Sequence, residues 1–186
     1  MALFKSALSA IKFAVNYSNE AYIGRSAVSK IADPSKGMVE GLEAGQAGMI
    51  LSMVKSSTDK MQEACLIARC AAHKLSCSCG APCCSKHKPN WSWHEAIELL
   101  SMEVKRVIEE DRKPGTRSIQ DSPVMRRALV AKYFGERIRV TDLAQACEIT
   151  DNTVANHSGR ITKILKQTEG SAWSLVEQRL RDAEII

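Results

Sequence analysis

The chain has 186 residues, of which 45% are hydrophobic and 25% charged, with a formal net charge of +5. These totals fit one large or two small globular domains with a real core, and they permit an anionic partner. They exclude a membrane-spanning helix, because no stretch approaches the roughly 18 apolar residues that one needs. Lys5 and Lys12 also interrupt the only segment that resembles an export signal. We therefore expect a cytoplasmic protein with reduced cysteines.

The first half of the chain predicts three helices. The first is amphipathic, with an apolar face formed by Leu3, Phe4, Leu8, Ile11 and Val15. The second is expected over residues 38–55, where three glycines lower helix stability or let a neighbouring helix approach closely. Ser57 or Thr58 is expected to cap the third, over about 59–75.

A cysteine-rich loop covers residues 76–90, and a strongly amphipathic helix follows it. Residues 112–122 combine mixed charge with a Pro-Gly corner, so we place a linker there between domains at 1–111 and 123–186. The stripe that predicts the helix before this linker consists of Trp93, Ile97, Leu100, Val104 and Ile108.

Beyond the linker, helices are predicted over 124–134, twice within 139–165, and from Ser171 to about Ala183. Residues 137–140 (RIRV) are the only strand candidate. The predicted fold class is therefore all-α: a helical N-terminal part with a cysteine-rich loop, followed by a small helical C-terminal domain.

The stretch 139–165, RVTDLAQACEITDNTVANHSGRITKIL, predicts two short helices joined by a tight corner. Thr141 can cap the first helix, and Thr150 or Asp151 the second. Leu143 and Ala144 would face inward, with Ile149 between the helices. The second helix would bury Val154, Ile161 and Leu165, which leaves these residues to solvent or a partner: Asn152, Thr153, Asn156, Ser158, Gly159, Arg160 and Lys163.

The chemistry of those polar residues suits a DNA duplex. Asn pairs with adenine and Arg with guanine when a helix lies in the major groove, whereas Thr and Lys suit phosphates. Residues 123–168 carry eight Lys or Arg, including Arg126, Arg127 and Lys163, against four acids. A plain helical hairpin with solvated Asn and Arg is the alternative interpretation.

The segment RRALVAKYFGERIRVTDLAQACEITDNTVANHSGRITKIL resembles the helix-turn-helix of sigma-factor promoter-recognition domains and of LuxR-type regulators. The likeness covers about 40 residues, and Cys147-Glu148 stands where these families commonly have Leu-Gly. The resemblance implies that DNA is contacted by Asn152, Thr153, Asn156 and Arg160. Lys163, Arg126 and Arg127 are further candidates for contact with double-stranded DNA.

The loop CSCGAPCCSKH predicts a structural zinc site, because zinc takes four Cys or His ligands held by short turns. C-x-C-x3-C-C is less specific than a two-residue CxxC knuckle, so reduced thiols and an iron–sulfur cluster remain alternatives. Trp91 and Trp93 are expected to pack against this loop. The candidate ligands are Cys77, Cys79, Cys83 and Cys84, completed by Cys70, His73 or His87.

These features predict a sequence-specific transcription regulator. The architecture also loosely resembles phage and prophage antitermination proteins of the Q type, which implies action on RNA polymerase at a late promoter. The acidic helix 95–111 is then a candidate polymerase contact. A zinc-stabilised protein–protein adaptor is the alternative. An enzyme is not expected, because no carboxylate or His cluster has a catalytic spacing.

Overall fold

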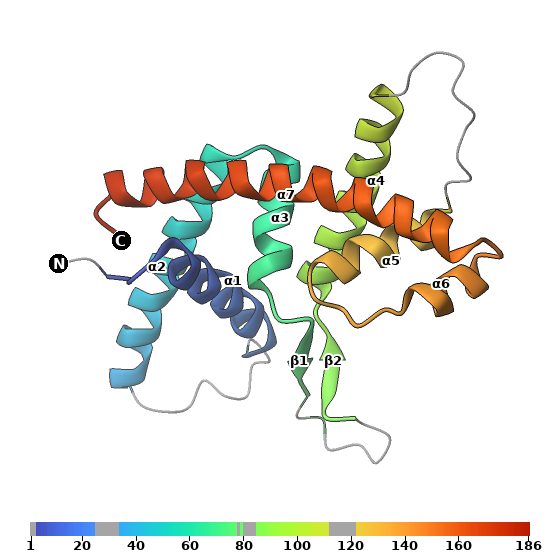
Figure 1. The fold of residues 1–186 in the computed structure, drawn as a ribbon. Coiled ribbons are helices and arrows are strands. Elements are labelled where there is room, and N and C mark those ends of the chain that lie inside the picture. Colours follow the sequence, from blue (N-terminus) through green and yellow to red (C-terminus); the bar gives the residue numbers. More distant parts are fainter. Residues whose placement is uncertain (1–2, 25–33, 78, 80–84, 112–121) are drawn as a thin grey trace.

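The computed structural model describes residues 3–24, 34–77, 79, 85–111 and 122–186. These residues are mostly helical, as the sequence predicts, and two short strands accompany the helices (Figure 1). In chain order the elements are α1 Ala7–Gly24, α2 Pro34–Ser57, α3 Lys60–Cys70, β1 Lys74–Ser76, β2 His87–Pro89, α4 Trp91–Glu110, α5 Pro123–Tyr133, α6 Val140–Ala146 and α7 Asp151–Asp182.

The residue that caps α3 is Asp59, one position after the predicted Thr58. Asp59 accepts the backbone N–H of Gln62 at 2.8 Å, and the Gln62 side chain accepts the Asp59 N–H at 3.0 Å. This reciprocal pair satisfies two of the donors that a helix start leaves open. The prediction that Ser57 or Thr58 caps α3 was wrong, because both hydroxyls donate hydrogen bonds to backbone carbonyls of α2.

The first two helices differ from the sequence prediction in their surfaces. Leu3 and Leu8 are exposed, and the buried face of α1 consists of Ala7, Ala10, Ile11, Ala14 and Val15. Small residues on this face permit the close packing between α1 and α2. Gly45 and Gly48 do not serve that packing, because a Cβ at either would meet nothing within 4 Å. The surroundings of Gly41 lie outside the described residues.

The cysteine-rich loop is carried on a β-hairpin that the sequence prediction missed. Strands β1 and β2 pair antiparallel, with Leu75 opposite Lys88, and the Cys77 N–H continues the ladder to the Lys86 carbonyl at 2.9 Å. Three-residue strands containing Lys and Pro carry little of the alternation that reveals a strand. The strand proposed at 137–140 was wrong: this segment leads into α6.

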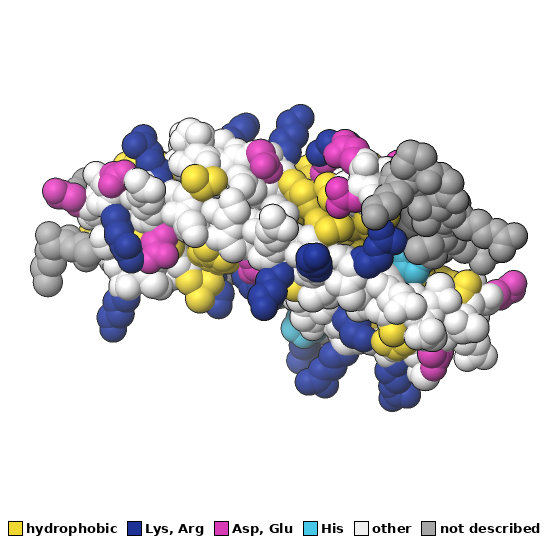
Figure 2. Space-filling model, turned by 45° about the horizontal axis from the view of Figure 1, so that its top comes forward, with side chains coloured by type: hydrophobic (Ala, Val, Ile, Leu, Met, Phe, Trp, Pro, Cys, Tyr) yellow, Lys and Arg dark blue, Asp and Glu magenta, His cyan; other side chains and the backbone are white. Residues whose placement is uncertain are grey.

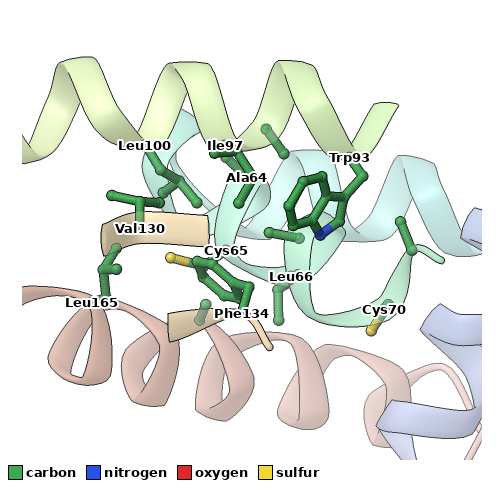
Figure 3. Close-up of a cluster of buried hydrophobic side chains, with 14 of the residues drawn as sticks. Ala64, Cys65, Leu66, Cys70, Trp93, Ile97, Leu100, Val130, Phe134 and Leu165 are labelled. Carbon is green, nitrogen blue, oxygen red and sulfur yellow. The ribbon is translucent and has the colours of Figure 1, made fainter. Parts of the chain in front are cut away.

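Helix α3 lies at the centre of the molecule, between α4, α5 and α7 (Figure 3). The predicted apolar stripe of α4 is confirmed, since four of its five residues are buried and Ile108 packs at the edge. The labelled core of Figure 3 consists of Ala64, Cys65, Leu66, Cys70, Trp93, Ile97, Leu100, Val130, Phe134 and Leu165.

Helix α7 is one continuous 32-residue helix that runs across the molecule (Figure 1). The predicted break before Ser171 was wrong, because Ala172, Val176 and Leu180 are buried and outweigh the cost of about 1 kcal/mol of Gly170. The helix contacts α1, α2 and α3 as well as α5 and α6, so the two predicted domains share an interface. Their predicted linker lies, apart from Ser122, outside the described residues.

Candidate nucleic-acid interface

A four-residue turn joins α6 to α7. The Ile149 N–H donates to the Ala144 carbonyl at 3.0 Å and the Glu148 N–H donates to the Gln145 carbonyl at 3.2 Å. These two bonds form a Schellman motif, which needs a left-handed residue just after the helix. Glu148 supplies it with a φ of 55°, although glycine adopts that conformation at lower cost.

The cap of α7 confirms one of the two predicted capping residues. Thr150 accepts the Thr153 N–H at 3.3 Å, and the two threonine hydroxyls lie 2.9 Å apart. Asp151 in the first turn complements the partial positive charge of the helix start. Thr153 is half-buried and its hydroxyl contacts Thr150, so little of this predicted DNA-contacting side chain is open to a ligand.

The cap and the turn orient α7 so that its apolar side faces α5 and α6. Val154, Ile161 and Leu165 are buried as predicted, and His157 is buried between them. Because neighbours on one helix face recur every three or four residues, the opposite side carries an exposed polar row. We call this row the α7 ridge: Asn152, Asn156, Arg160 and Lys163.

The α7 ridge extends about 16 Å along the helix, from the rise of 1.5 Å per residue. Gly159 lies beside it, and a Cβ there would meet nothing within 4 Å. Within the described residues, neither Arg160 nor Lys163 has an ion-pair partner. In Figure 2, Lys and Arg side chains protrude along the face formed by α7.

A groove of about 640 Å³ borders the α7 ridge where α7 passes the start of α3 and the end of α4. Arg160 and Lys163 line one wall, and Asp59 and Asp111 line the other. The two cations of the ridge therefore stand across a groove from two carboxylates, whereas the neutral Asn152 and Asn156 lie outside this groove.

Arg126 and Arg127 do not join the α7 ridge. Arg126 is 6% exposed, and its Nε donates to the Ser101 carbonyl at 2.7 Å, so this side chain holds α5 against α4. Its sequence-based assignment to DNA contact is corrected here: a buried guanidinium cannot reach a phosphate. Arg127 is exposed and pairs with Glu98 at 3.1 Å on another side of α5.

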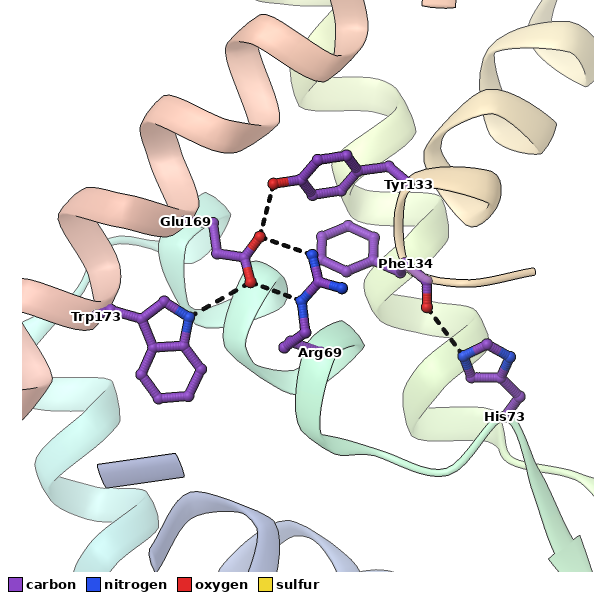
Figure 4. A network of polar contacts seen from close by, with 6 residues as sticks. All are labelled: Arg69, His73, Tyr133, Phe134, Glu169 and Trp173. Carbon is purple, nitrogen blue, oxygen red and sulfur yellow. Dashed lines mark hydrogen bonds and ion pairs between the residues drawn. The ribbon is translucent and has the colours of Figure 1, made fainter. Parts of the chain in front are cut away.

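A buried polar network anchors the middle of α7 and was not predicted from the sequence (Figure 4). Arg69 of α3 donates to both oxygens of Glu169, through Nε at 2.6 Å and Nη2 at 2.8 Å. The Tyr133 hydroxyl donates to Oε2 at 2.7 Å, and the Trp173 indole donates to Oε1 at 3.3 Å. Arg69 and Glu169 are 100 residues apart in the sequence, so no local sequence pattern predicts their contact.

The ionisation of this network follows from its contacts. Burial favours the neutral form of Glu169, but the hydrogen bonds from Arg69 and Tyr133 outweigh it and hold the pKa of Glu169 below its ordinary value. Burial and the same carboxylate raise the pKa of Tyr133 to about 12. The network is thus an ionised pair at neutral pH whose role is to fix α7 on α3.

The structure describes five of the seven predicted zinc ligands. Cys77 and Cys79 lie at the end of the hairpin and His87 on β2, whereas Cys83 and Cys84 lie outside the described residues. Cys70 is buried in the core, and burial raises the pKa of its thiol to about 12, so it stays protonated. Among the described residues, no three Cys, His, Asp or Glu side chains gather as a metal site.

His73 is also held elsewhere. Its Nε2 lies 3.1 Å from the Phe134 carbonyl oxygen, and its ring centroid is 4.3 Å from that of Trp93. The predicted roles of Cys70 and His73 as zinc ligands are therefore not supported by this arrangement. The zinc prediction itself now concerns the hairpin cysteines and His87.

The two tryptophans that flank the loop have opposite environments. Trp93 is 2% exposed and belongs to the core, whereas Trp91 is 73% exposed. The expectation that both pack against the loop was wrong for Trp91.

No protein-family model matches the chain, and the comparisons with curated proteins and with solved structures return no significant match. Within the described ranges, no helix is both long and apolar enough to cross a bilayer.

Proposed function

We propose that the protein is a cytoplasmic, sequence-specific DNA-binding transcription regulator that reads a duplex with the α7 ridge. The observation that carries the proposal is the exposure of Asn152, Asn156, Arg160 and Lys163 on one face of a helix that follows a tight turn. Amide and guanidinium groups are the side chains that pair in two places with adenine and guanine. Their polar ends face outward here and remain open to such pairing.

Each residue of the ridge has a distinct part in this proposal. Asn152 and Asn156 pair with base edges, and Arg160 pairs with a guanine one turn further on. Lys163 contacts a phosphate and adds salt-dependent affinity without sequence preference. Gly159 has no side chain, which lets the backbone approach the groove floor.

The resemblance to Q-type antitermination proteins adds a finer proposal: the bound protein acts on RNA polymerase at a late promoter. The outer face of α4 supports a protein contact, because exposed acids and the exposed Met102 lie on it. An in vitro transcription assay on a template with a downstream terminator tests this step. The protein is expected to increase read-through, whereas a simple repressor would reduce transcript from the start site.

A zinc-stabilised adaptor is the second candidate function. It is favoured by an apolar groove of about 480 Å³ between α4 and α5, which Trp93, Ile97 and Val124 help to line. An adaptor would use this groove for a protein partner and would bind any duplex weakly and without preference.

Selection of bound duplexes from a random pool separates the two candidates. A DNA reader is expected to enrich one consensus sequence, and that duplex should bind at least about 10³-fold more tightly than the unselected pool. An adaptor would return no consensus after repeated rounds, and that result would contradict the proposal.

The zinc proposal is tested separately, because the α7 ridge contains none of the candidate zinc ligands. Elemental analysis of the purified chain is expected to give one zinc ion per molecule, held by the hairpin cysteines. A fully folded, metal-free sample would end the zinc proposal and leave the α7 ridge untouched.

A further inference from the structure

A second cationic surface lies on the hairpin, and the proposed function does not use it. Residues 64–94 contain no Asp or Glu, whereas Lys74, Lys86 and Lys88 lie on the strands or beside them. Lys74 and Lys86 are exposed and Lys88 is half-buried. Because Lys74 pairs with Pro89 and Lys88 with Leu75, Lys74 lies on one face of the hairpin and Lys88 on the other, and Lys86 shares the face of Lys88. None of the three has an ion-pair partner within the part of the chain that the structure describes.

The loop between α5 and α6 extends this surface. His73 directly precedes Lys74, and its ring is held by the Phe134 carbonyl at 3.1 Å. A Cβ at Gly135 would stand 3.7 Å from the same ring. This contact places the start of the α5–α6 loop beside the base of the hairpin, and the loop carries the exposed Arg137 and Arg139 and a single acid, Glu136.

Trp91 lies at the base of the hairpin, two residues after β2. Its indole is exposed, and its ring centroid is 6.4 Å from that of His94 in an edge-to-face arrangement. Single-strand binders combine an exposed aromatic ring with cations: the cations follow the phosphates and the ring stacks on a base. Glu95, one turn after Trp91 on α4, is exposed as well, so the phosphates are expected to lie on the hairpin side of Trp91.

The hairpin extends from the helical body away from α7 (Figure 1). The hairpin surface and the α7 ridge are therefore separate, and each can bind its own ligand.

We propose that the hairpin and the α5–α6 loop bind single-stranded nucleic acid, with Lys86, Lys88 and Arg137 on the phosphates and Trp91 stacked on an unpaired base. Duplex DNA does not offer Trp91 an open base face, so this surface prefers single strands to duplexes. The proposal stands on these contacts alone and does not require the duplex-reading role of α7.

The test uses the full chain and two fluorescein-labelled 20-mers, oligo-dT and oligo-U, in anisotropy titrations. Trp91→Ala is expected to weaken binding at least about fivefold, the lower end for loss of one stacked base. Met102→Ala, which removes another exposed apolar side chain from α4, should leave it unchanged. A preference for oligo-U over oligo-dT would identify RNA as the natural strand.

Salt dependence tests the cations. The triple variant Lys86→Gln, Lys88→Gln, Arg137→Gln is expected to lower the slope of log K against log salt by about 2, because each single-strand phosphate contact contributes about 0.7. The control triple, Lys55→Gln, Lys60→Gln, Lys105→Gln, removes three exposed cations located elsewhere and should keep the slope.

Three results would overturn the proposal. Binding of neither 20-mer would do so, as would binding that Trp91→Ala and the hairpin triple leave unchanged. Equal weakening by Asn156→Ala and Arg160→Ala would place the single strand on the α7 ridge instead. A failed duplex selection combined with intact 20-mer binding would reject the DNA-reader function and leave this surface standing.

Discussion

The two halves of α7 use polar residues in opposite ways. In the middle of the helix, the Glu169 carboxylate accepts hydrogen bonds from Arg69, Tyr133 and Trp173 (Figure 4). In the first three turns, the polar groups of the α7 ridge point to solvent. One helix therefore carries both an internal anchor and an open surface.

The two halves therefore distinguish polar groups that stabilise the fold from polar groups that are available to a ligand. A buried polar group with its partners in place stabilises the fold, and removing one partner leaves the others unsatisfied. An exposed polar row contributes little to stability, so its composition is free to suit a ligand. Variants in the two halves should thus affect different measurements.

The largest effect is expected from Glu169→Ala. This change leaves the Arg69 guanidinium and the Tyr133 hydroxyl without their acceptor, which should lower the free energy of unfolding by about 3 kcal/mol. Urea denaturation followed by circular dichroism measures it. Glu177→Ala breaks an exposed pair with Arg181 on the same helix and should cost less than about 1 kcal/mol. Equal losses would show that the Glu169 network stabilises the fold no more than an exposed ion pair does.

The pH dependence sharpens the same point. Because the pKa of Glu169 in the folded chain is below its ordinary value of 4.5, the ionised pair stabilises the fold above that pH. This contribution should disappear as the pH falls through the lowered value. The stability difference between the wild type and Glu169→Gln is therefore expected to be constant from pH 7 to 5 and to shrink below about 4. If the stability difference between the wild type and Glu169→Gln grew as the pH fell, the pKa of Glu169 would not be lowered in the folded chain.

Glu148→Gly tests how the first half of α7 is held. A left-handed residue other than glycine costs about 1 kcal/mol, so the glycine variant should be more stable by about that amount. Glu148→Gln keeps the strained backbone and removes only the charge, and it should not show this gain. Gly135→Ala, at the equivalent place after α5 with a φ of 103°, should be destabilised instead.

Gly159 and Gly170 form a matched pair on the two halves of α7. A Cβ at either would meet nothing within 4 Å, so Gly→Ala should raise stability by up to about 1 kcal/mol at both positions. Only Gly159→Ala places its methyl group on the α7 ridge, and only this variant should weaken duplex binding. Identical effects of the two variants on binding would show that duplexes do not approach the ridge.

The sequence predicts most local features of this surface, but the predicted cap Thr141 was wrong: it lies inside α6, whose N-cap is Arg139 and has no side-chain cap hydrogen bond. Thr150 as cap and the burial of Val154, Ile161 and Leu165 follow from spacing and capping chemistry, which act within one helix. The exposure of the α7 ridge follows from the same periodicity.

Features that depend on distant contacts could not be predicted. Gly170-Ser171 reads as a break because the packing of α7 on α2 and α3 is invisible in a local window. Arg126 reads as a surface cation, yet the carbonyl of Ser101 accepts it in the core. The pairing of Arg69 with Glu169 joins residues 100 positions apart. Each case is a tertiary contact that overrides a local preference.

The most direct test of the central proposal is a competition titration with the selected duplex and a scrambled one. Asn156→Ala and Arg160→Ala are each expected to lower the ratio of specific to nonspecific affinity about 5- to 150-fold, the equivalent of 1–3 kcal/mol per base contact, without loss of thermal stability. An unchanged ratio in both variants, with duplex affinity intact, would show that α7 does not read bases.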